Sequence, residues 1–369
     1  MNIDLKKYIE QISRVPELFE FIPKELKGHK EFMLLLAETR VGKNSNILDD
    51  CPESILDDKN IALRYTALEG HSLKYFSNRL KNDKDVVLSA LNSTGSAMKY
   101  ASESLRNNRD FVLDAVKVRG HSIQYVAKKI LNDRQIAFEA VQSNPVAFQY
   151  ISEDLRDEKE ILLMALEKNS SMITYASQRL KDDEEIAYKV AYNSPRSINE
   201  LSERFKNNDE IAYIAVYKDG KAIKEVSDRL KNDKDLALLA VSQDPFALEY
   251  LSNEFKDNEE IILKAVEKNN YVFLYASPRI KSNRDIVLNL VNKDGMILDI
   301  LNDDLKEDKE IALAAYKNDK GASVCFPKSL KQLIGDKNIV TCLESLILKE
   351  QIEKEIVPNL ETTIKKAKI

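Results

Sequence analysis

Apolar and polar residues follow one another along this chain in a pattern that returns every 25 residues. Residues 80–90 read LKNDKDVVLSA, and residues 105–115 read LRNNRDFVLDA. The leading apolar position keeps its register through eleven successive copies without an insertion or deletion. Its occupants are Ile55, Leu80, Leu105, Ile130, Leu155, Leu180, Phe205, Leu230, Phe255, Ile280 and Leu305. Self-similarity at a fixed short period is the signature of a repeat architecture, so we predict a tandem-repeat protein.

The first half of each copy predicts an amphipathic α-helix. Apolar residues follow the leading position by six, seven, ten and eleven residues, as at Val86 and Ala90, and this spacing describes one broad helical face. Asp or Asn precedes nearly every one of these helices, as Asp83 does, and is a good N-cap. An acidic residue such as Asp85 usually follows in the first turn, where the helix dipole favours it.

The second half of each copy predicts another helix, introduced by Gly or Pro as at Pro145. Its apolar residues, for example Phe148, Ile151 and Leu155, are three and four apart, which is typical of one helical stripe. Two helices of about 8 to 11 residues are too short to be stable alone in water, so neighbouring copies must stack. The predicted fold is all-α: a right-handed α-α solenoid of about thirteen short helix pairs.

The register weakens toward both ends of the chain, which suggests three parts. We expect residues 1–54 to form an N-terminal cap and a first helix pair, with extra loop residues near 42–46. Residues 55–320 carry the regular 25-residue repeats. Residues 321–369 are expected to form a degenerate last repeat and a C-terminal capping helix, because a solenoid needs atypical terminal units.

Composition and charge narrow the classes of function. No apolar run approaches the 18 or more residues of a membrane span, and residues 1–10 lack the features of a secretory signal. The three cysteines have no C-x-x-C spacing, which argues against a disulfide framework and favours a reducing cytoplasm. The net charge of −5, with both signs interleaved, argues mildly against non-specific binding to nucleic acid or anionic lipid.

Residues that could carry chemistry are scarce. His71 and His121 occupy the same repeat position two copies apart, which places them about 20 Å from one another at helix-packing spacing, too far to share a metal ion. The sequence contains no glycine-rich phosphate loop, nucleophile elbow or H-E-x-x-H motif. We therefore expect no catalytic residue, no metal site and no cofactor.

Two polar rows run through the second predicted helices. The serine row is expected to lie inside those helices, bonding back to the preceding turn or allowing close packing. The tyrosine row could stack bases, but acidic neighbours favour packing between repeats. The serines are Ser77, Ser102, Ser152, Ser177, Ser202, Ser227, Ser252 and Ser277, and the tyrosines are Tyr75, Tyr100, Tyr125, Tyr150, Tyr175, Tyr250 and Tyr275.

The phrase GSAMKYASESLRNNRDFVLDAV at residues 95–116, which recurs at 171–191, resembles a bacterial, protist and large-virus repeat family. That family is labelled only as a domain of unknown function, number four thousand one hundred and sixteen, and its unit resembles two of the present 25-residue steps. The resemblance covers roughly residues 56–315. It implies helical tandem repeats and brings no catalytic residue, cofactor or established activity. The leucine-rich repeat variant is a weaker match, because it lacks the Tyr-Ala-Ser phrase.

Candidate partner-binding residues stand where copies depart from their own pattern. Large apolar or aromatic side chains replace polar ones on the first helix at Met164, Ile214 and Leu239, and three residues further along at Tyr192 and Tyr217. Glu200 and Glu225 replace the usual tyrosine in two consecutive copies. If exposed, these residues mark an interaction surface; otherwise the curvature of the solenoid covers them. A second stripe, carrying the same alternative, comprises Phe246, Tyr271 and Met296.

The leading functional hypothesis is a non-catalytic scaffold that binds a partner protein and regulates or inhibits a larger complex. The family's distribution implies a setting that includes conflict between host and phage or parasite. The first alternative is a nucleic-acid-binding repeat protein, for which Lys or Arg after the leading position, as at Lys81 and Arg156, would supply a basic ladder. The second alternative is an enzyme of unrecognised type.

Overall fold

Each 25-residue step forms three helical segments in a fixed order. In one step these are the ten-residue α7 (Lys84–Ser93), the 3-10 helix η5 (Gly95–Tyr100) and the one-turn α8 (Glu103–Arg106). The computed structural model describes residues 9–10, 22–39, 45–335, 337–352 and 354, and all regular structure within these ranges is helical. The prediction of an all-α solenoid with a 25-residue period is confirmed. The expected extra loop residues at 42–44 and part of the first helix pair lie outside the described residues.

The chain divides into two compact units, Met1–Ile186 and Ala187–Ile369. The first unit contains α2 (Lys24–Lys27), α3 (Lys30–Ala37), η3 (Ser45–Leu48), α4 (Glu53–Leu56), α5 (Lys59–Leu68), η4 (Gly70–Tyr75), α6 (Asn78–Lys81), α7, η5, α8, α9 (Arg109–Val118), η6 (Gly120–Tyr125), η7 (Lys128–Asn132), α10 (Arg134–Ser143), η8 (Pro145–Gln149), α11 (Glu153–Arg156), α12 (Lys159–Lys168), η9 (Ser170–Tyr175) and α13 (Gln178–Lys181). Helix α14 (Glu184–Asn193) contains the division.

The second unit repeats the same order. It contains η10 (Pro195–Glu200), α15 (Glu203–Lys206), α16 (Asp209–Lys218), η11 (Gly220–Glu225), α17 (Asp228–Lys231), α18 (Lys234–Gln243), η12 (Pro245–Tyr250), α19 (Asn253–Lys256), α20 (Glu259–Val266), η13 (Asn270–Tyr275), α21 (Pro278–Lys281), α22 (Arg284–Lys293), η14 (Gly295–Ile300), α23 (Asp303–Glu307), α24 (Lys309–Asn318), η15 (Lys320–Cys325), α25 (Lys328–Ile334) and α26 (Ile339–Gln351). The last two helices depart from the pattern, since α25 ends at Gly335 with a positive φ of 53° and α26 has 13 residues.

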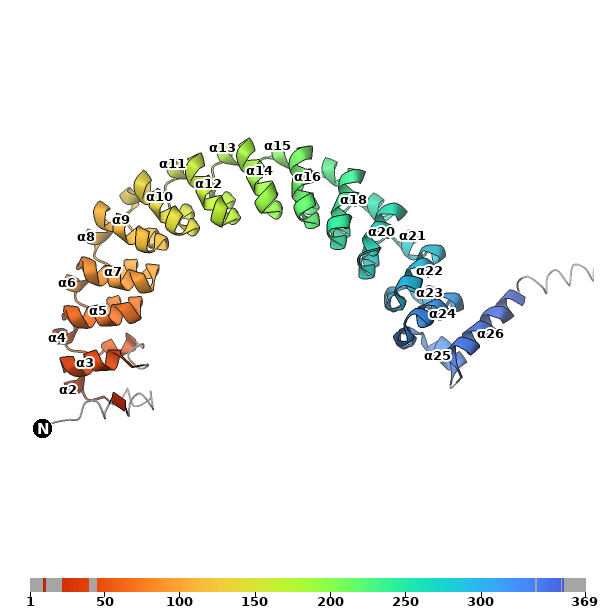
Figure 1. Ribbon diagram of the computed structural model, residues 1–369, viewed down its shortest axis with the longest axis horizontal. Coiled ribbons are helices and arrows are strands. Elements are labelled where there is room, and N and C mark those ends of the chain that lie inside the picture. The colour runs from red at the N-terminus through yellow and green to blue at the C-terminus, as the bar shows by residue number, and fades with distance from the viewer. Residues whose placement is uncertain (1–8, 11–21, 40–44, 336, 353, 355–369) are drawn as a thin grey trace, which may run out of the picture. The chain divides into compact units, whose positions relative to one another are not determined.

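Within each unit the long α-helices form one row and the 3-10 helices form another. In the first unit α5, α7, α9, α10 and α12 contact one another in chain order, and so do η4, η5, η6, η8 and η9 (Figure 1). The core lies between the two rows, where Val86 and Ala90 of α7 meet Met98 of η5 and all three are fully buried. Asp83 caps α7 as predicted, because its side chain accepts hydrogen bonds from the amides of Asp85 and Val86.

The second predicted helix is not continuous, which corrects the sequence-based expectation of 8 to 11 helical residues. The backbone is extended at Phe76 (φ −73°, ψ 163°) and Ser77 (φ −61°, ψ 159°), between η4 and α6. The amide of Ser77 donates to the carbonyl of Leu56 in the preceding repeat at 3.0 Å instead of continuing the helix. A 3-10 helix also aligns residues three apart, so the apolar spacing did not distinguish the two arrangements.

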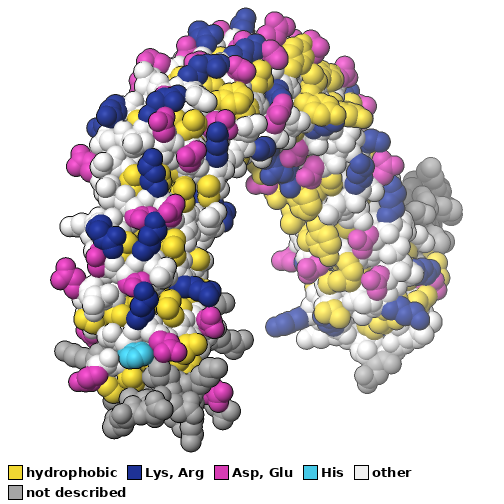
Figure 2. All heavy atoms as spheres, turned by 60° about the vertical axis from the view of Figure 1, so that its left-hand side comes forward, with side chains coloured by type: hydrophobic (Ala, Val, Ile, Leu, Met, Phe, Trp, Pro, Cys, Tyr) yellow, Lys and Arg dark blue, Asp and Glu magenta, His cyan; other side chains and the backbone are white. Residues whose placement is uncertain are grey.

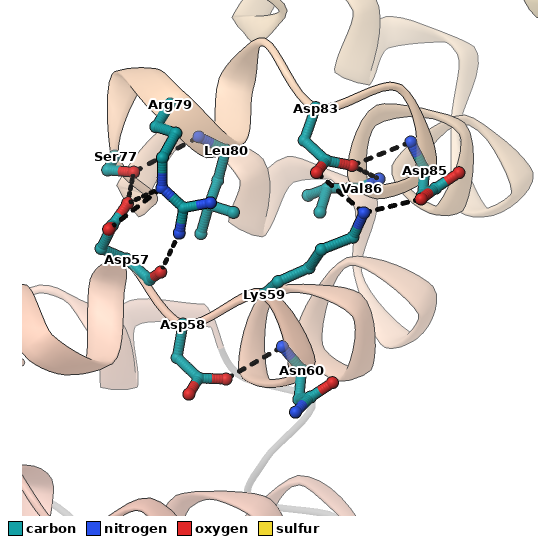
Figure 3. Close-up of polar contacts among 10 residues, drawn as sticks. All are labelled: Asp57, Asp58, Lys59, Asn60, Ser77, Arg79, Leu80, Asp83, Asp85 and Val86. Carbon is teal, nitrogen blue, oxygen red and sulfur yellow. Dashed lines mark hydrogen bonds and ion pairs between the residues drawn. The ribbon is translucent and has the colours of Figure 1, made fainter.

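All the serines of the row stand at the N-caps of the one-turn helices, and all but Ser202 cap them with a side-chain hydrogen bond, so the expectation that these residues lie inside a helix was wrong. The Ser77 hydroxyl accepts from the amide of Leu80 at 3.3 Å and donates to the carboxylate of Asp57 in the preceding repeat (Figure 3). Arg79 donates to the same carboxylate through its Nε at 3.0 Å. We call this arrangement the serine clasp. It recurs as Ser177–Asp157–Arg179 and Ser277–Asp257–Arg279.

A second contact between repeats is a ladder of ion pairs along the long helices. Lys59 lies 2.8 Å from Asp83 and 2.6 Å from Asp85 of the next repeat (Figure 3). Arg134 pairs in the same way with Glu158 at 2.7 Å and Glu160 at 2.6 Å. The acidic residue of the first turn therefore binds a basic side chain of its neighbour, in addition to the predicted interaction with its own helix dipole.

Candidate functional site

The outward face of α16 differs in kind from that of a typical repeat. On α9 this face carries Asp114 and Lys117, which are both exposed. On α16 the run Ile211–Tyr217 is apolar at every position. Ile211, Ala212, Ala215 and Val216 fill the core, so the remaining side chains of the run point away from it. A helix that is apolar all round is normally buried.

The exposed side chains of this run are aromatic. Tyr217 keeps 62% of its surface accessible and Tyr213 keeps 39%, whereas Ile214 between them is half-buried. Tyrosine has a large apolar ring with a polar tip, which is a composition favoured at protein interfaces. The structure therefore leaves a substantial aromatic surface uncovered on a single helix.

Neighbouring helices extend this surface within the second unit. Tyr192 of α14 is 58% exposed, and the ammonium of Lys218 on α16 lies 3.6 Å from its ring centroid. Helix α18 contacts both α16 and α20. We define the apolar band as Tyr192, Tyr213, Ile214, Tyr217, Leu238, Leu239 and Leu263. On the face seen in Figure 2, hydrophobic side chains form surface patches with acidic and basic side chains beside them.

Charge is distributed unevenly along the apolar band. Glu210, Asp235 and Glu260, which we define as the acidic edge, are exposed in the first turns of α16, α18 and α20. Glu260 pairs with Lys234 at 2.6 Å, whereas Glu210 and Asp235 form no ion pair within the described part of the chain. Partial burial raises the pKa of Tyr213, and the charges of Asp233, Asp235 and Asp209 raise it further. The field at this end of the band is therefore negative.

The opposite end of the band carries two lysines, together with the exposed Glu267 that follows α20. Lys218 ends α16 beside Tyr192, and Lys268 follows α20. Lys268 donates to the carbonyl of Ser242 at the end of α18. Acidic groups therefore predominate at the N-terminal ends of these helices, whereas basic residues stand at the C-terminal ends of α16 and α20 only, and the apolar band lies between the two ends.

The structure gathers some of the candidate residues and separates others. Tyr192, Ile214, Tyr217 and Leu239 lie together in the apolar band. Met164 is half-buried on α12 and belongs to the first unit. Glu200 and Glu225 end η10 and η11, so they are half-buried in the 3-10 row rather than in the band.

The second stripe occupies the first turns of η12, η13 and η14. Phe246 is 36% exposed, Tyr271 is 50% exposed and Met296 is half-buried. The ammonium of Lys221 lies 5.2 Å from the Phe246 ring centroid. Leu274, at 49% exposure, adds to the apolar surface of η13. This stripe belongs to the 3-10 row, in which η12, η13 and η14 contact one another in chain order.

Sequence reasoning missed Tyr213, Leu238 and Leu263 as members of the band. All three occupy a position that is apolar in every regular repeat, from Leu63 to Leu313, so none of them breaks the pattern. In most repeats this residue is half-buried, as Leu88 and Leu113 are. Its exposure depends on the neighbouring side chains, which the repeat pattern alone does not specify.

The basic ladder that favoured nucleic-acid binding is largely used within the solenoid. The ammonium of Lys181 donates to the carbonyl of Thr174 at 3.0 Å, and that of Lys256 donates to the carbonyl of Glu249 at 2.7 Å. The guanidinium of Arg156 donates to the carbonyl of Tyr175 at 3.3 Å. These carbonyls lie at the C-terminal ends of 3-10 helices, where the helix itself offers them no partner.

The histidines lie in separate local contacts. Nε2 of His71 is 2.7 Å from the hydroxyl of Ser96, and the ring of His121 stands edge-on to Tyr150 with centroids 5.6 Å apart. Among the described residues there is no group of three or more His, Cys, Asp or Glu side chains that could hold a metal ion. Over the same residues, every helix is too short or too polar to pass through a membrane.

Ten overlapping segments of the chain match one sequence family, described as Domain of unknown function (DUF4116). They are residues 58–106, 83–132, 108–156, 133–181, 158–206, 183–231, 208–256, 233–281, 258–306 and 283–331. Successive matches begin 25 residues apart and each covers two steps of the repeat, so the family resemblance predicted from the sequence is confirmed. Neither the curated proteins nor the solved structures contain a match to the chain.

Proposed function

The chain belongs to the tandem-repeat family described as Domain of unknown function (DUF4116), and on that premise we propose that it is a non-catalytic scaffold that recognises a partner protein through the apolar band. Stacked repeats supply a rigid support from which side chains of successive helices act together. Binding without chemistry suits a regulator or an inhibitor of a larger complex. The free thiols of Cys51, Cys325 and Cys342 are consistent with a reducing cytoplasm.

The observation that supports this proposal most strongly is that α16 is apolar at every position from Ile211 to Tyr217, on its outward as well as its inward face. Its inward residues already fill the core, so its outward residues contribute little to folding in the isolated chain. Exposed apolar surface that spans several elements and is rimmed by charge marks an interaction site. Tyrosines with more than half of their surface accessible, such as Tyr192 and Tyr217, are the residue type that dominates binding energy at interfaces.

Nucleic-acid binding has less support from the same residues. A phosphate backbone requires basic side chains that are available to it. Lys181, Lys256 and Arg156 instead donate to backbone carbonyls of the solenoid. The acidic edge would also repel a polyanion that approached the apolar band.

Comparative affinity purification tests the proposal. The full chain and the variant Tyr192→Ala/Tyr217→Ala/Leu239→Ser are purified from cells of the source, with and without nuclease, and bound proteins are identified by mass spectrometry. We expect a protein that remains after nuclease treatment and is lost from the variant, while both chains keep the same helical circular dichroism spectrum.

The matched control is Tyr175→Ala/Leu333→Ser, which removes exposed apolar side chains outside the band, at 37% and 53% exposure. This control should retain the partner. Release of the partner by nuclease would instead favour the nucleic-acid alternative. Loss of the partner from Phe246→Ala/Tyr271→Ala, with the band intact, would move the site to the 3-10 row.

A further inference from the structure

The spacing and chemistry of the apolar band specify what kind of protein segment can occupy it. We propose that the band binds an amphipathic α-helix that lies across α14, α16, α18 and α20 and carries basic residues along one flank. This inference rests on the proposed function, because it names the class of partner for the same surface. Three features support it: the spacing of the helices, the aliphatic side chains Ile214 and Leu239 at the centre of the band, and the distribution of charge.

The repeat spacing matches the period of a helical ligand. Packed helices lie about 8 to 10 Å apart, so the apolar side chains of successive long helices recur at about that interval. Seven residues of an α-helix rise about 10.5 Å and return the side chain to nearly the same face. One apolar heptad position of the partner can therefore contact each successive repeat. Four neighbouring helices span about 30 Å, the length of about 20 helical residues.

The central part of the band favours a helix over an extended peptide. An extended segment needs hydrogen-bond partners for its own amides and carbonyls wherever it loses water. The side chains presented at the centre are Ile214, Tyr217 and Leu239, and neither isoleucine nor leucine offers a polar group. An α-helix satisfies its backbone internally and can cover such a surface at lower cost.

The charge distribution orients the partner. Glu210 and Asp235 have no ion-pair partner within the described ranges, and Glu260, which pairs with Lys234, continues the acidic edge on α20. Lys218 and Lys268 stand at the other rim. A helix with Lys or Arg along the flank that faces Glu210 and Asp235 would complement this rim, and a helix with acidic residues there would be repelled.

Selection from a displayed library of random peptides of about 24 residues, long enough for the span, tests this inference on the full chain. For each peptide that binds the wild type, its affinity is compared with its affinity for two variants, Tyr217→Ala/Leu239→Ser and Glu210→Lys/Asp235→Lys. We expect peptides with apolar residues at i, i+3 or i+4 and i+7 and a basic flank. These peptides should become helical on binding. Their affinity for the charge-reversed variant Glu210→Lys/Asp235→Lys should be about tenfold lower than for the wild type.

Each outcome separates the inference from the proposed function. Glu254→Lys/Asp303→Lys makes the same charge change at exposed positions outside the band and should leave affinity within about twofold. Peptides that depend on Tyr217 and Leu239 but are proline-rich, acidic or indifferent to Glu210→Lys/Asp235→Lys would overturn the helical, basic partner and leave protein recognition standing. If no selected peptide depends on Tyr217 and Leu239, both the inference and the proposed site fail.

Discussion

The hydroxyl of Ser102 donates a 2.5 Å hydrogen bond to the side-chain oxygen of Asn82 in the preceding repeat. The same hydroxyl accepts from the amide of Leu105 at 3.2 Å, so one residue caps α8 and joins two repeats. The amide of Ser102 adds a backbone hydrogen bond to the carbonyl of Lys81 at 2.8 Å. Contacts between repeats therefore include specific polar bonds as well as apolar packing.

Ser102→Ala should lower the free energy of unfolding by about 0.5 to 2 kcal/mol, the usual cost of losing an N-cap serine. Ser104→Ala in the same helix is the matched control, because Ser104 is exposed and has no hydrogen bond within the described part of the chain. We expect the control to change stability by less than about 0.5 kcal/mol. Urea unfolding of both variants measures the difference, and equal effects would refute the capping role of Ser102.

The serine clasp should make stability depend on pH. The hydrogen bond from Ser177 and the ion pair with Arg179 hold the pKa of Asp157 below its ordinary value of 3.8. The corresponding partners lower the pKa of Asp57 and of Asp257. A lowered folded-state pKa stabilises the protein fully above the unfolded value, and this stability is lost as pH falls through the lower folded value.

The variant Asp57→Asn/Asp157→Asn/Asp257→Asn should therefore lose less stability than the wild type between pH 5 and pH 2. Asparagine keeps an acceptor for the serine, as Asn82 and Asn132 do in other repeats. Urea midpoints measured across this range give the comparison. Asp114→Asn, at an exposed residue without a hydrogen bond or ion pair in the described ranges, is the control and should follow the wild type. If the stability of the triple variant fell with pH as steeply as that of the wild type, the serine clasp would not be the source of the pH dependence.

Ala140 lies fully buried on α10, so Ala140→Glu should destabilise the protein by several kcal/mol through burial of an unpaired charge. Gln142→Glu introduces the same side chain at an exposed position of the same helix and should change stability by less than about 0.5 kcal/mol. Thermal and urea unfolding distinguish the two. A small effect of Ala140→Glu would show that this face of α10 is not in the core.

Gly120 is required by close approach of the next repeat. A Cβ atom there would lie 2.2 Å from the carbonyl oxygen of Ala140, whereas a Cβ at Gly95 would meet its nearest atom, the amide of Ser122, at 3.3 Å. Gly120→Ala should therefore cost about 1 to 3 kcal/mol of stability, as overpacking typically does. Gly95→Ala at the equivalent repeat position should cost clearly less. Equal urea midpoints for the two variants would contradict the close approach of the Ala140 carbonyl to Gly120.

The sequence predicted the long helices well because their signals are local. Asp83 caps α7, and Val86 and Ala90 are buried, as the repeat pattern indicates. The break before Ser77 was not predicted, since its determinants are distant: the Leu56 carbonyl and the Asp57 carboxylate belong to the preceding repeat. A serine stands three residues before eight of the eleven leading apolar residues, and this was an available capping signal.

The candidate site was predicted in part for the same reason. Ile214, Tyr217 and Leu239 replace polar residues, so a comparison of repeats finds them. Glu200 and Glu225 also depart from the pattern but stand in the 3-10 row, because the tyrosines they replace do. Their binding role and that of Met164 stay predictions, as does that of the second stripe.

The dissociation constant of the nuclease-resistant partner for the wild type and for Tyr192→Ala/Tyr217→Ala/Leu239→Ser tests the central claim most directly. Both proteins should first show the same helical spectrum and closely similar urea midpoints, since Tyr192 and Tyr217 are 58% and 62% exposed. We predict that the variant binds about 100-fold more weakly, a loss of about 2.7 kcal/mol that is typical of removing interface hot spots. Unchanged affinity in the folded variant, or unfolding of the variant, would contradict a binding role for the apolar band.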